Sequence, residues 1–455
     1  MLLLVLQGCE QTPMLDRLQS KGKLHVATVA GPLSCYLGET GAAGLEYELA
    51  NAFAKDLGLT AEIKVYSSRY QAVQAVKNGT EDMVANWYPS STPLSGKQIS
   101  SAWMHTQVKF VHFMGSKAYN PDKMTQTKLA VPKSTGVAQL VKQQHLPVQF
   151  LDISEEQLLK QINSGTYKYS LSSKAQIDTH RRFLPYLVSG KSLQSSLEMH
   201  WLFPGFYDDS LGEQANRFLQ QIQANGYLKT LQDKYIHNLP KHNFVTRRNF
   251  WKQVESRLPK YLDLFKQAGK DTGIDWRLLA AIGYQESHWN EKATSPTGVR
   301  GIMMLTLDTA KQQNIKNRLD PKQSIIGGAR HLLWMEQRIP SHIQGEDLLW
   351  FTLASYNIGY GHLEDARILT ERAGQNPNSW ESVKKHLPLL RQKKYYSTLK
   401  YGRARGNEPV TYVENIRYYY SLLVYWDNQQ HGRNCSTGMS QTTTLRLRTP
   451  DHQTP

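Results

Sequence analysis

The sequence contains few of the features that would indicate a metal centre, a disulfide-stabilised domain or a membrane-spanning protein. Its 455 residues include only three cysteines, Cys9, Cys35 and Cys435, which are far apart and form no C-x-x-C pair. This spacing predicts neither a disulfide framework nor a structural zinc site. No later segment has the ~20 consecutive apolar residues that a transmembrane helix needs. Because H-E-x-x-H and phosphate-binding glycine loops are also missing, we expect no metal and no cofactor.

Acidic residues are also scarce relative to basic ones. The 38 Asp and Glu residues are outnumbered by 54 Lys and Arg residues, which gives a formal net charge of +16. Such an excess favours an anionic partner, which could be a nucleic acid, an acidic lipid or a carboxylate-bearing polymer. No nucleic-acid-binding motif accompanies the charge, so we expect no nucleic acid.

The N-terminal segment is apolar but short. "MLLLVLQGCE" cannot span a bilayer and has no basic residues before its apolar run. Leu6-Gln7-Gly8-Cys9 nevertheless resembles the lipobox of bacterial lipoproteins, in which the cysteine is acylated. This resemblance implies that residues 1–9 are a truncated signal ending in a lipidation site at Cys9. Glu10 after the cysteine is typical of lipoproteins anchored at the periplasmic side of the outer membrane.

The order of the predicted helices and strands divides the chain into two domains. Between residues 21 and 240, short apolar strands alternate with amphipathic helices, for example 23–31, 45–59 and 60–67, which predicts an α/β domain with a largely parallel sheet. A polar, basic stretch at 241–251 is interpreted as a linker. Helical segments dominate 252–430, so this second domain is mainly α. Residues 431–455 have too little apolar content to fold and are expected to be disordered.

The first domain resembles the periplasmic solute-binding proteins that serve amino-acid transporters. The segment that carries the resemblance is Gly44–Leu49, "GLEYEL", between the first strand and its helix. The family implies two α/β lobes that close on a small ligand. Where relatives place an arginine and an aspartate for an amino-acid ligand, this chain offers Lys97 and Ser173, so free amino acids are poor candidates. A scaffold without a ligand and a regulatory domain that binds a muropeptide both remain open.

The second domain contains a glutamate where an apolar helix face should continue. In "IDWRLLAAIGYQESHWN", Glu286 follows Leu279 by seven residues and Ile282 by four, so it points in the same direction. Asp275 is a good N-cap, and a helix ending near His288 places Glu286 in its last turn. Apolar surroundings and the negative end of the helix dipole both disfavour the carboxylate. The pattern predicts a carboxylic acid that keeps its proton, as a general acid requires.

Four motifs in order accompany this glutamate. They are "YQES", "GIMM", "SYN" and "YVEN", and together they resemble the lytic transglycosylases with a goose-type lysozyme fold. The resemblance implies Glu286 as the catalytic residue. It also implies substrate-binding roles for a further set of residues: Ser287, Met303, Met304, Tyr356, Asn357 and Tyr412. Tyr356 is the candidate hydrogen-bond partner of Glu286.

The resemblance also implies the reaction. Relatives cleave the β-1,4 bond between N-acetylmuramic acid and N-acetylglucosamine in peptidoglycan and leave a 1,6-anhydromuramic acid end. A second carboxylate, which most glycosidases need, does not stand out near these motifs. Two alternatives remain open from the residues alone: a hydrolytic muramidase, and a non-catalytic lipoprotein that only binds glycan or solute.

Overall fold

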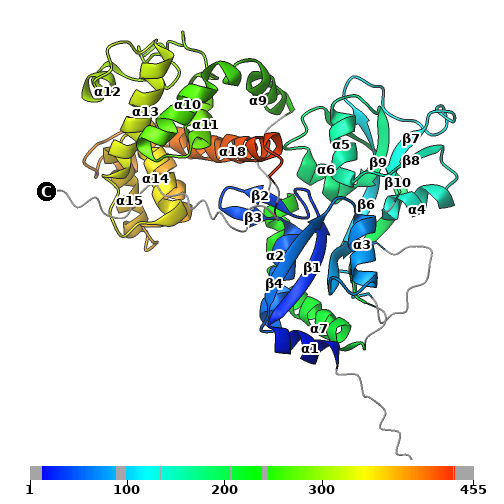
Figure 1. Ribbon diagram of the computed structural model, residues 1–455. Coiled ribbons are helices and arrows are strands. Elements are labelled where there is room, and N and C mark those ends of the chain that lie inside the picture. Colours follow the sequence, from blue (N-terminus) through cyan, green and yellow to red (C-terminus); the bar gives the residue numbers. More distant parts are fainter. Residues whose placement is uncertain are drawn as a thin grey trace, which may run out of the picture. The chain divides into compact units, whose positions relative to one another are not determined.

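The computed structural model describes residues 13–88, 99–133, 135–204, 208–237, 244–433 and 435. These residues form two compact units (Figure 1). The first unit contains the described residues up to 237 together with those from Asn428 onwards, and the second contains 244–427. The tail predicted to be disordered lies outside the described residues apart from 431–433 and Cys435, as do Cys9 and Lys97.

An eight-stranded sheet organises the first unit. Its strands lie in the order β4 (Thr60–Tyr66), β1 (Lys23–Val29), β5 (Met83–Trp87), β10 (Leu187–Leu202), β6 (Met104–Phe113), β9 (Tyr169–Ser173), β7 (Leu129–Pro132) and β8 (Val148–Leu151). The strands β4, β1 and β5 are parallel and form the sheet of a first lobe, while β9, β7 and β8 are parallel and form that of a second lobe. The two-lobed α/β fold predicted from the sequence is therefore confirmed.

Two long strands link the lobes. β10 pairs antiparallel with β5 near its C-terminal end and with β6 along most of its length, and β6 pairs antiparallel with β9. The prediction of a largely parallel sheet is therefore wrong for these central pairs. Exposed polar residues of β10 such as Ser192 interrupt its apolar pattern, so the sequence did not indicate this pairing.

Helices cover both lobes. Those of the first lobe are α1 (Met14–Lys21), α2 (Leu45–Asp56), α3 (Arg69–Lys77), α7 (Ser210–Ala224), α8 (Tyr227–Gln232) and the π-helix η1 (Asp233–His237). Those of the second lobe are α4 (Gly136–Gln143), α5 (Glu155–Asn163) and α6 (Lys174–His180). Local sequence sets their starts, because the hydroxyls of Ser68, Thr135, Ser154 and Ser173 each accept a hydrogen bond from the first turn. A small hairpin, β2 (Tyr36–Gly38) and β3 (Gly41–Ala43), precedes α2.

A disulfide joins the N-terminal part of the first unit to the last described residue of the chain. Cys35, next to the hairpin, is bonded to Cys435, although 400 residues separate them. Nearby, the Asn428 side-chain amide donates a hydrogen bond to the Leu37 carbonyl at 3.0 Å. The expectation that the cysteines form no disulfide was wrong, because sequence spacing cannot reveal that a chain returns to its starting domain after completing a second one.

The second unit is helical. Its helices are α9 (Phe244–Ser256), α10 (Leu258–Thr272), α11 (Trp276–Ser287), α12 (Leu307–Gln312), α13 (Pro321–Glu336), α14 (Gly345–Ile358), α15 (Tyr360–Arg372), α16 (Trp380–His386), the 3₁₀ helix η2 (Leu387–Arg391), α17 (Lys393–Tyr396) and α18 (Asn407–Gln430). From Phe244 onwards the stretch interpreted as a linker is helical. Its Phe250 side chain is fully buried and packs against the rings of Tyr284 and Tyr419, so α9 belongs to the core of this unit.

Candidate active site

Helix α11 lies at the centre of the site. Its N-cap is Asp275, whose carboxylate accepts hydrogen bonds from the Arg277 amide at 2.9 Å and from the Tyr420 hydroxyl at 2.8 Å. It ends at His288, which has a left-handed φ of 52°. The predicted start and end of this helix are both confirmed. Leu278, Leu279 and Ile282 on its apolar face have no exposed surface, which fixes the helix in the core.

Glu286 lies in the last turn of α11 and is partly buried. Burial raises the pKa of its carboxyl from 4.5 to about 7, and a hydrogen bond from Tyr412 opposes this shift. The environment therefore favours the neutral acid until the pH approaches neutrality. A carboxyl group with such a pKa can donate a proton and then accept one under the same conditions.

The hydrogen-bond partner of Glu286 is Tyr412, on α18. The Tyr412 hydroxyl donates to Glu286 Oε1 at 2.6 Å, while the Tyr356 hydroxyl donates to the Met303 carbonyl oxygen at 3.2 Å. The expectation that Tyr356 bonds Glu286 was therefore wrong. The two tyrosine rings lie nearly parallel, 6.5 Å between centroids and 13° between planes, and together form an aromatic wall beside the acid.

A tight loop lies next to α11. Gly298 and Gly301 have φ values of 81° and 84°, which glycine adopts readily and which permit a tight turn. Ser324 accepts a hydrogen bond from the Met303 amide at 3.1 Å, and Ser287 donates one to the Ile302 carbonyl at 2.9 Å. The loop is thus attached to both α13 and α11.

The substrate-binding candidates differ in how they are exposed. Met303 has no exposed surface, and its side chain packs against Gly328 of α13. It therefore belongs to the core beneath the loop. Ser287 is hydrogen-bonded to the backbone of Gly283 and Ile302, which makes it a structural residue in this state. Met304 is partly exposed and has a left-handed φ of 47°, and Asn357 is exposed at the end of α14. Of these four, only Asn357 is exposed, while Ser287 and Met304 are partly buried.

Glu286 has no carboxylate neighbour among the described residues that affects its titration. The titratable groups that interact with it there are two tyrosines, Tyr412 and Tyr356. Glu291 accepts a hydrogen bond from the Tyr261 hydroxyl at 3.0 Å, and Asp308 lies in the first turn of α12. Among the described residues, the site therefore consists of one carboxylic acid with a raised pKa and the hydroxyl groups of two tyrosines, Tyr356 and Tyr412.

One residue that positions the site was missed by sequence reasoning. Trp289 is fully buried, has a left-handed φ of 55°, and donates from its indole Nε1 to the Ala280 carbonyl at 2.8 Å. It folds the chain back onto α11 just after the helix ends and packs edge-on against Tyr284. A tryptophan three residues after the acid was the available signal, because a large ring at a helix end often anchors the following turn.

In the first unit, Ser173 is not among the residues that line the cleft between the lobes. Its hydroxyl caps α6 by accepting from the Gln176 amide, and it has no exposed surface. Arg69 of the first lobe and Glu155 of the second form a buried ion pair at 3.1 Å. Arg69 also donates to the Asn86 carbonyl, while the Asn86 amide donates to buried Glu46. The open space at this cleft is only about 20 Å³.

Two family models match the chain in the order of its two units. The model for bacterial extracellular solute-binding proteins, family 3, matches residues 24–238, and the model for the transglycosylase SLT domain matches residues 263–378. Membrane-bound lytic murein transglycosylase F of Hahella chejuensis is 38% identical over 447 residues, which cover 96% of this chain and 88% of that protein. The protein of the same name from Shewanella loihica is 39% identical over 419 residues, with 90% and 87% covered.

The chain belongs to the membrane-bound lytic murein transglycosylase F family. Like other members of this family, it is a lytic transglycosylase that acts on peptidoglycan. The matched SLT range contains Glu286, Met303 and Tyr356 but ends before α18, so Tyr412 reaches the acid from outside it. Among the residues that the structure describes, no helix is both long and apolar enough to cross a lipid bilayer.

Proposed function

We propose that Glu286 acts first as the acid and then as the base in a lytic transglycosylase reaction that ends in a 1,6-anhydromuramic acid. The observation that carries this proposal is the single carboxyl group with a pKa of about 7, which Tyr412 holds by a hydrogen bond of 2.6 Å. Most retaining or inverting glycosidases need two carboxyl groups at a defined separation. A site with one acid favours a mechanism in which the substrate supplies the second function.

The proposed reaction does not use water as a reactant. Glu286 gives its proton to the glycosidic oxygen, and the bond between C1 of N-acetylmuramic acid and that oxygen breaks. The carbonyl oxygen of the N-acetyl group stabilises the positive charge that develops at C1. The Glu286 carboxylate then takes the proton from the 6-hydroxyl, whose oxygen attacks C1 and closes the anhydro ring. The acid is regenerated in the form in which it started.

The side chains around Glu286 have complementary proposed roles. Tyr412 orients the carboxyl group and stabilises its ionised form between the two proton transfers. Met304 is partly exposed and Asn357 is exposed, and both contact the sugar, whereas Met303 and Ser287 hold the loop and the helix in register. Tyr356 completes the aromatic wall on which a sugar ring can pack.

The test is mass spectrometry of purified peptidoglycan digested by the wild-type protein and by Glu286→Gln. The wild type should release muropeptides with anhydro ends, and the variant should lose at least ~10²–10⁴-fold in rate because glutamine cannot transfer the proton. Hydrated, reducing ends would instead identify a hydrolytic muramidase, and normal turnover by a folded Glu286→Gln protein would exclude this residue as the acid.

We also propose a lipid anchor at Cys9, which holds the protein at the periplasmic side of the outer membrane. The membrane-bound name of the relatives supports membrane association, and the Cys35–Cys435 disulfide supports an oxidising compartment such as the periplasm. Expressed with a complete signal sequence, the wild type should sediment with outer membranes, and Cys9→Ala should become soluble because several acyl chains are lost. Equal retention of Cys9→Ala after a high-salt wash would contradict the anchor.

For the first unit we propose a regulatory ligand of the muropeptide class, with Lys97 and Ser173 as the original candidates for its site. A muropeptide has carboxylates in its peptide stem that suit a basic binding site. Lys97 lies outside the described residues, and the capping hydrogen bond and complete burial of Ser173 argue for a structural role. Ser173 is therefore a poor ligand contact in this state, and Lys97 stays a candidate.

A further inference from the structure

A basic segment of the second unit, residues 391–405, follows the part of the chain that the SLT model matches. Its sequence, "RQKKYYSTLKYGRAR", contains six Lys or Arg residues, three tyrosines and no Asp or Glu. The SLT match ends at residue 378, so the similarity to that domain assigns this segment no role. All six cationic side chains are exposed, as is the side chain of Tyr401, which is 49% exposed.

Most cations of this segment have no acidic partner. Arg405 pairs with Glu408 at 3.4 Å, and such an exposed pair is weak. The other five form no ion pair with a described residue: Arg391, Lys393, Lys394, Lys400 and Arg403. The ammonium groups of Lys394 and Lys400 lie 5.3 Å and 5.4 Å from the ring centroid of the tyrosine that follows each lysine. The segment therefore carries five positive charges that are available to an anionic partner.

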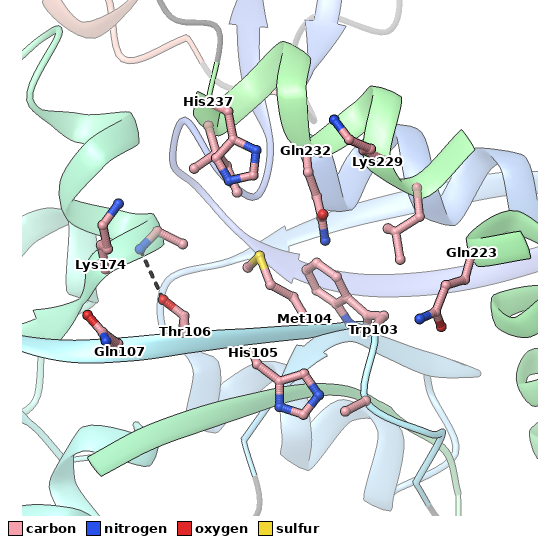
Figure 2. Close-up of a pocket in the computed structure, with 14 residues that line it drawn as sticks. Trp103, Met104, His105, Thr106, Gln107, Lys174, Gln223, Lys229, Gln232 and His237 are labelled. Carbon is pink, nitrogen blue, oxygen red and sulfur yellow. Dashed lines mark hydrogen bonds between the residues drawn. The ribbon is translucent and has the colours of Figure 1, made fainter. Parts of the chain in front are cut away.

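The basic residues around a cavity of the first unit differ in this respect. This cavity has a volume of about 500 Å³ and is drawn in Figure 2. Each of its four basic lining residues already has an acidic partner: Lys174 pairs with Asp178, Lys229 and His237 with Asp233, and His105 with Glu198. The positive charge in that cavity is thus largely balanced, whereas the charge of residues 391–405 is not.

Backbone hydrogen bonds hold the basic segment against the rest of the second unit. The Tyr401 amide donates to the buried Asp365 carboxylate at 3.0 Å, and the Ala404 amide donates to the Leu390 carbonyl at 3.1 Å. Leu390 itself has no exposed surface. Because the backbone is fixed in this way, the segment loses less conformational entropy on binding a partner than a free chain would.

The segment lies next to the elements that carry the site. The Tyr401 ring packs so closely on Gly361 that an added Cβ would lie 2.6 Å from it, and it packs edge-on against His362 at 6.1 Å between centroids. Both of these residues are in the first turn of α15, shortly after the exposed Asn357. The segment also leads directly into α18, the helix whose tyrosine bonds the acid. A glycan strand that extends from Glu286 past Asn357 towards α15 therefore meets this basic surface.

The peptide stems of peptidoglycan carry anionic groups that fit this surface. The chain acts on peptidoglycan, and the stems recur along each strand. Several carboxylates are thus presented at once, so that weak ion pairs reinforce one another. Lysine and arginine pair with carboxylates, and the exposed or partly exposed tyrosine rings offer faces to sugars. A lipid headgroup would also pair with these cations, but the neighbouring site binds a glycan strand, which favours the stems.

We propose that residues 391–405 form a surface that binds the carboxylates of peptide stems, so that the enzyme takes strands with free stem carboxylates in preference to strands without them. The inference deepens the proposed function and rests on it only in taking Glu286 as the point at which the strand is cut. The ion pairs form equally well before and during the reaction. They therefore lower KM and leave kcat unchanged.

The first test measures binding without turnover, by sedimentation of the full chain carrying Glu286→Gln with purified peptidoglycan. A second batch of the same peptidoglycan has its carboxylates blocked by carbodiimide coupling to methylamine. In this parent, the combined changes Lys393→Gln, Lys394→Gln and Lys400→Gln should weaken binding to the unblocked batch about tenfold, as the loss of three exposed ion pairs allows. Blocking should weaken binding by the parent to a similar extent.

The two losses should not add, because the three substitutions and the blocking remove opposite sides of the same ion pairs. Additive losses, or unchanged binding by the triple variant, would overturn the proposal.

Two controls exclude other causes. Lys252→Gln, Lys266→Gln and Lys270→Gln together change the net charge equally at exposed lysines of α9 and α10, and this variant should bind as the parent does. An equal loss in this variant would make the effect one of net charge and refute the proposal. Vesicles of phosphatidylglycerol are the second control. If the variant of residues 391–405 loses binding to vesicles and keeps binding to peptidoglycan, the surface serves a membrane and the proposal is wrong.

Kinetics with Glu286 intact separate this proposal from the catalytic one. On soluble, uncrosslinked strands, the variant of residues 391–405 should show a KM raised about tenfold and an unchanged kcat. A normal KM together with anhydro ends would refute the surface and leave the catalytic proposal standing. Hydrated ends from the wild type would refute the proposed chemistry at Glu286, while the binding result, obtained without turnover, would still stand.

Discussion

At the scale of single residues, the behaviour of Glu286 depends on a balance between burial and one hydrogen bond. Burial raises its pKa, and the Tyr412 hydroxyl, which favours the ionised form, lowers it to the final value of about 7. The sequence predicted the first effect, because the spacing from Leu279 and Ile282 places the carboxyl on an apolar face. It could not predict the second. Tyr412 is 126 residues away, and only the tertiary fold brings it rather than Tyr356 to the acid.

We expect the pH dependence of activity to report this pKa. Because the reaction starts from the protonated acid, kcat/KM should be constant below about pH 6 and fall tenfold per pH unit above about 7.

The free energy of unfolding should also depend on the protonation of Glu286. The folded-state pKa is raised above the ordinary 4.5, so folding loses stability as the pH rises from about 4.5 to 7 and no further above that. Denaturant titrations at pH 5 and 8 should show a smaller pH-dependent loss for Glu286→Gln than for the wild type, by up to ~3 kcal/mol.

Mutation should distinguish the roles of the two tyrosines beside the acid, because each one has a different hydrogen-bond partner. Tyr412→Phe removes the hydrogen bond that lowers the pKa of Glu286, so the falling limb of the pH profile should move to higher pH while kcat drops roughly 10–100-fold through lost orientation. Tyr356→Phe removes a bond to the Met303 carbonyl instead, and should leave that limb in place. Identical pH limbs in wild type and Tyr412→Phe would show that Tyr412 does not act through Glu286.

At the scale of elements, the site depends on how the loop between α11 and α12 is held. Gly301 approaches the segment before α13 so closely that an added Cβ would lie 1.8 Å from the Arg318 carbonyl oxygen. The helix boundaries and the tight turn were predictable from local signals, namely Asp275 as a cap and glycines in the loop. The attachment of the loop through Ser287 and Ser324 was not, because such bonds depend on tertiary position and not on sequence spacing.

Gly301→Ala and Gly298→Ala form a matched pair for testing this loop. Both glycines have positive φ values, so each alanine should cost about 1 kcal/mol in backbone strain. Gly298 has open space around its Cβ position, whereas at Gly301 the backbone must move. Urea unfolding should therefore show a loss of roughly 3 kcal/mol or more for Gly301→Ala, and its activity should fall with the displaced Met303 and Met304. Equal stability of the two variants would mean that the close approach to Arg318 is not maintained in solution.

At the scale of the whole molecule, composition and alternation of elements predicted two units of different class, and the structure confirms an α/β unit and a mainly helical one. The exception is the return of the chain to the first unit at Asn428, near the end of α18. Patterns along a sequence describe neighbours in the chain, and neither the pairing of Cys35 with Cys435 nor the contact of Asn428 with Leu37 leaves a local signal.

The disulfide should contribute substantially to the stability of the first unit. In a chain-entropy description, a disulfide stabilises the folded state more when it closes a longer loop, and this loop has 400 residues. We therefore expect Cys35→Ser with Cys435→Ser to lower the free energy of unfolding by roughly 3–5 kcal/mol. Peptide mapping under non-reducing conditions should recover the two cysteines in one linked fragment, and Cys9→Ala should leave that fragment intact. Two free thiols in protein isolated from the periplasm would contradict the pairing.

The same bond also imposes an order of events on biosynthesis. Cys35 emerges from the ribosome long before Cys435, and the whole catalytic unit is synthesised between them. During that interval Cys35 is an unpaired thiol, because its partner Cys435 has not yet been synthesised. A shortened chain that stops after Asp427 would retain every residue proposed for catalysis. It would lack Cys435, so after export its Cys35 could form disulfides with other chains.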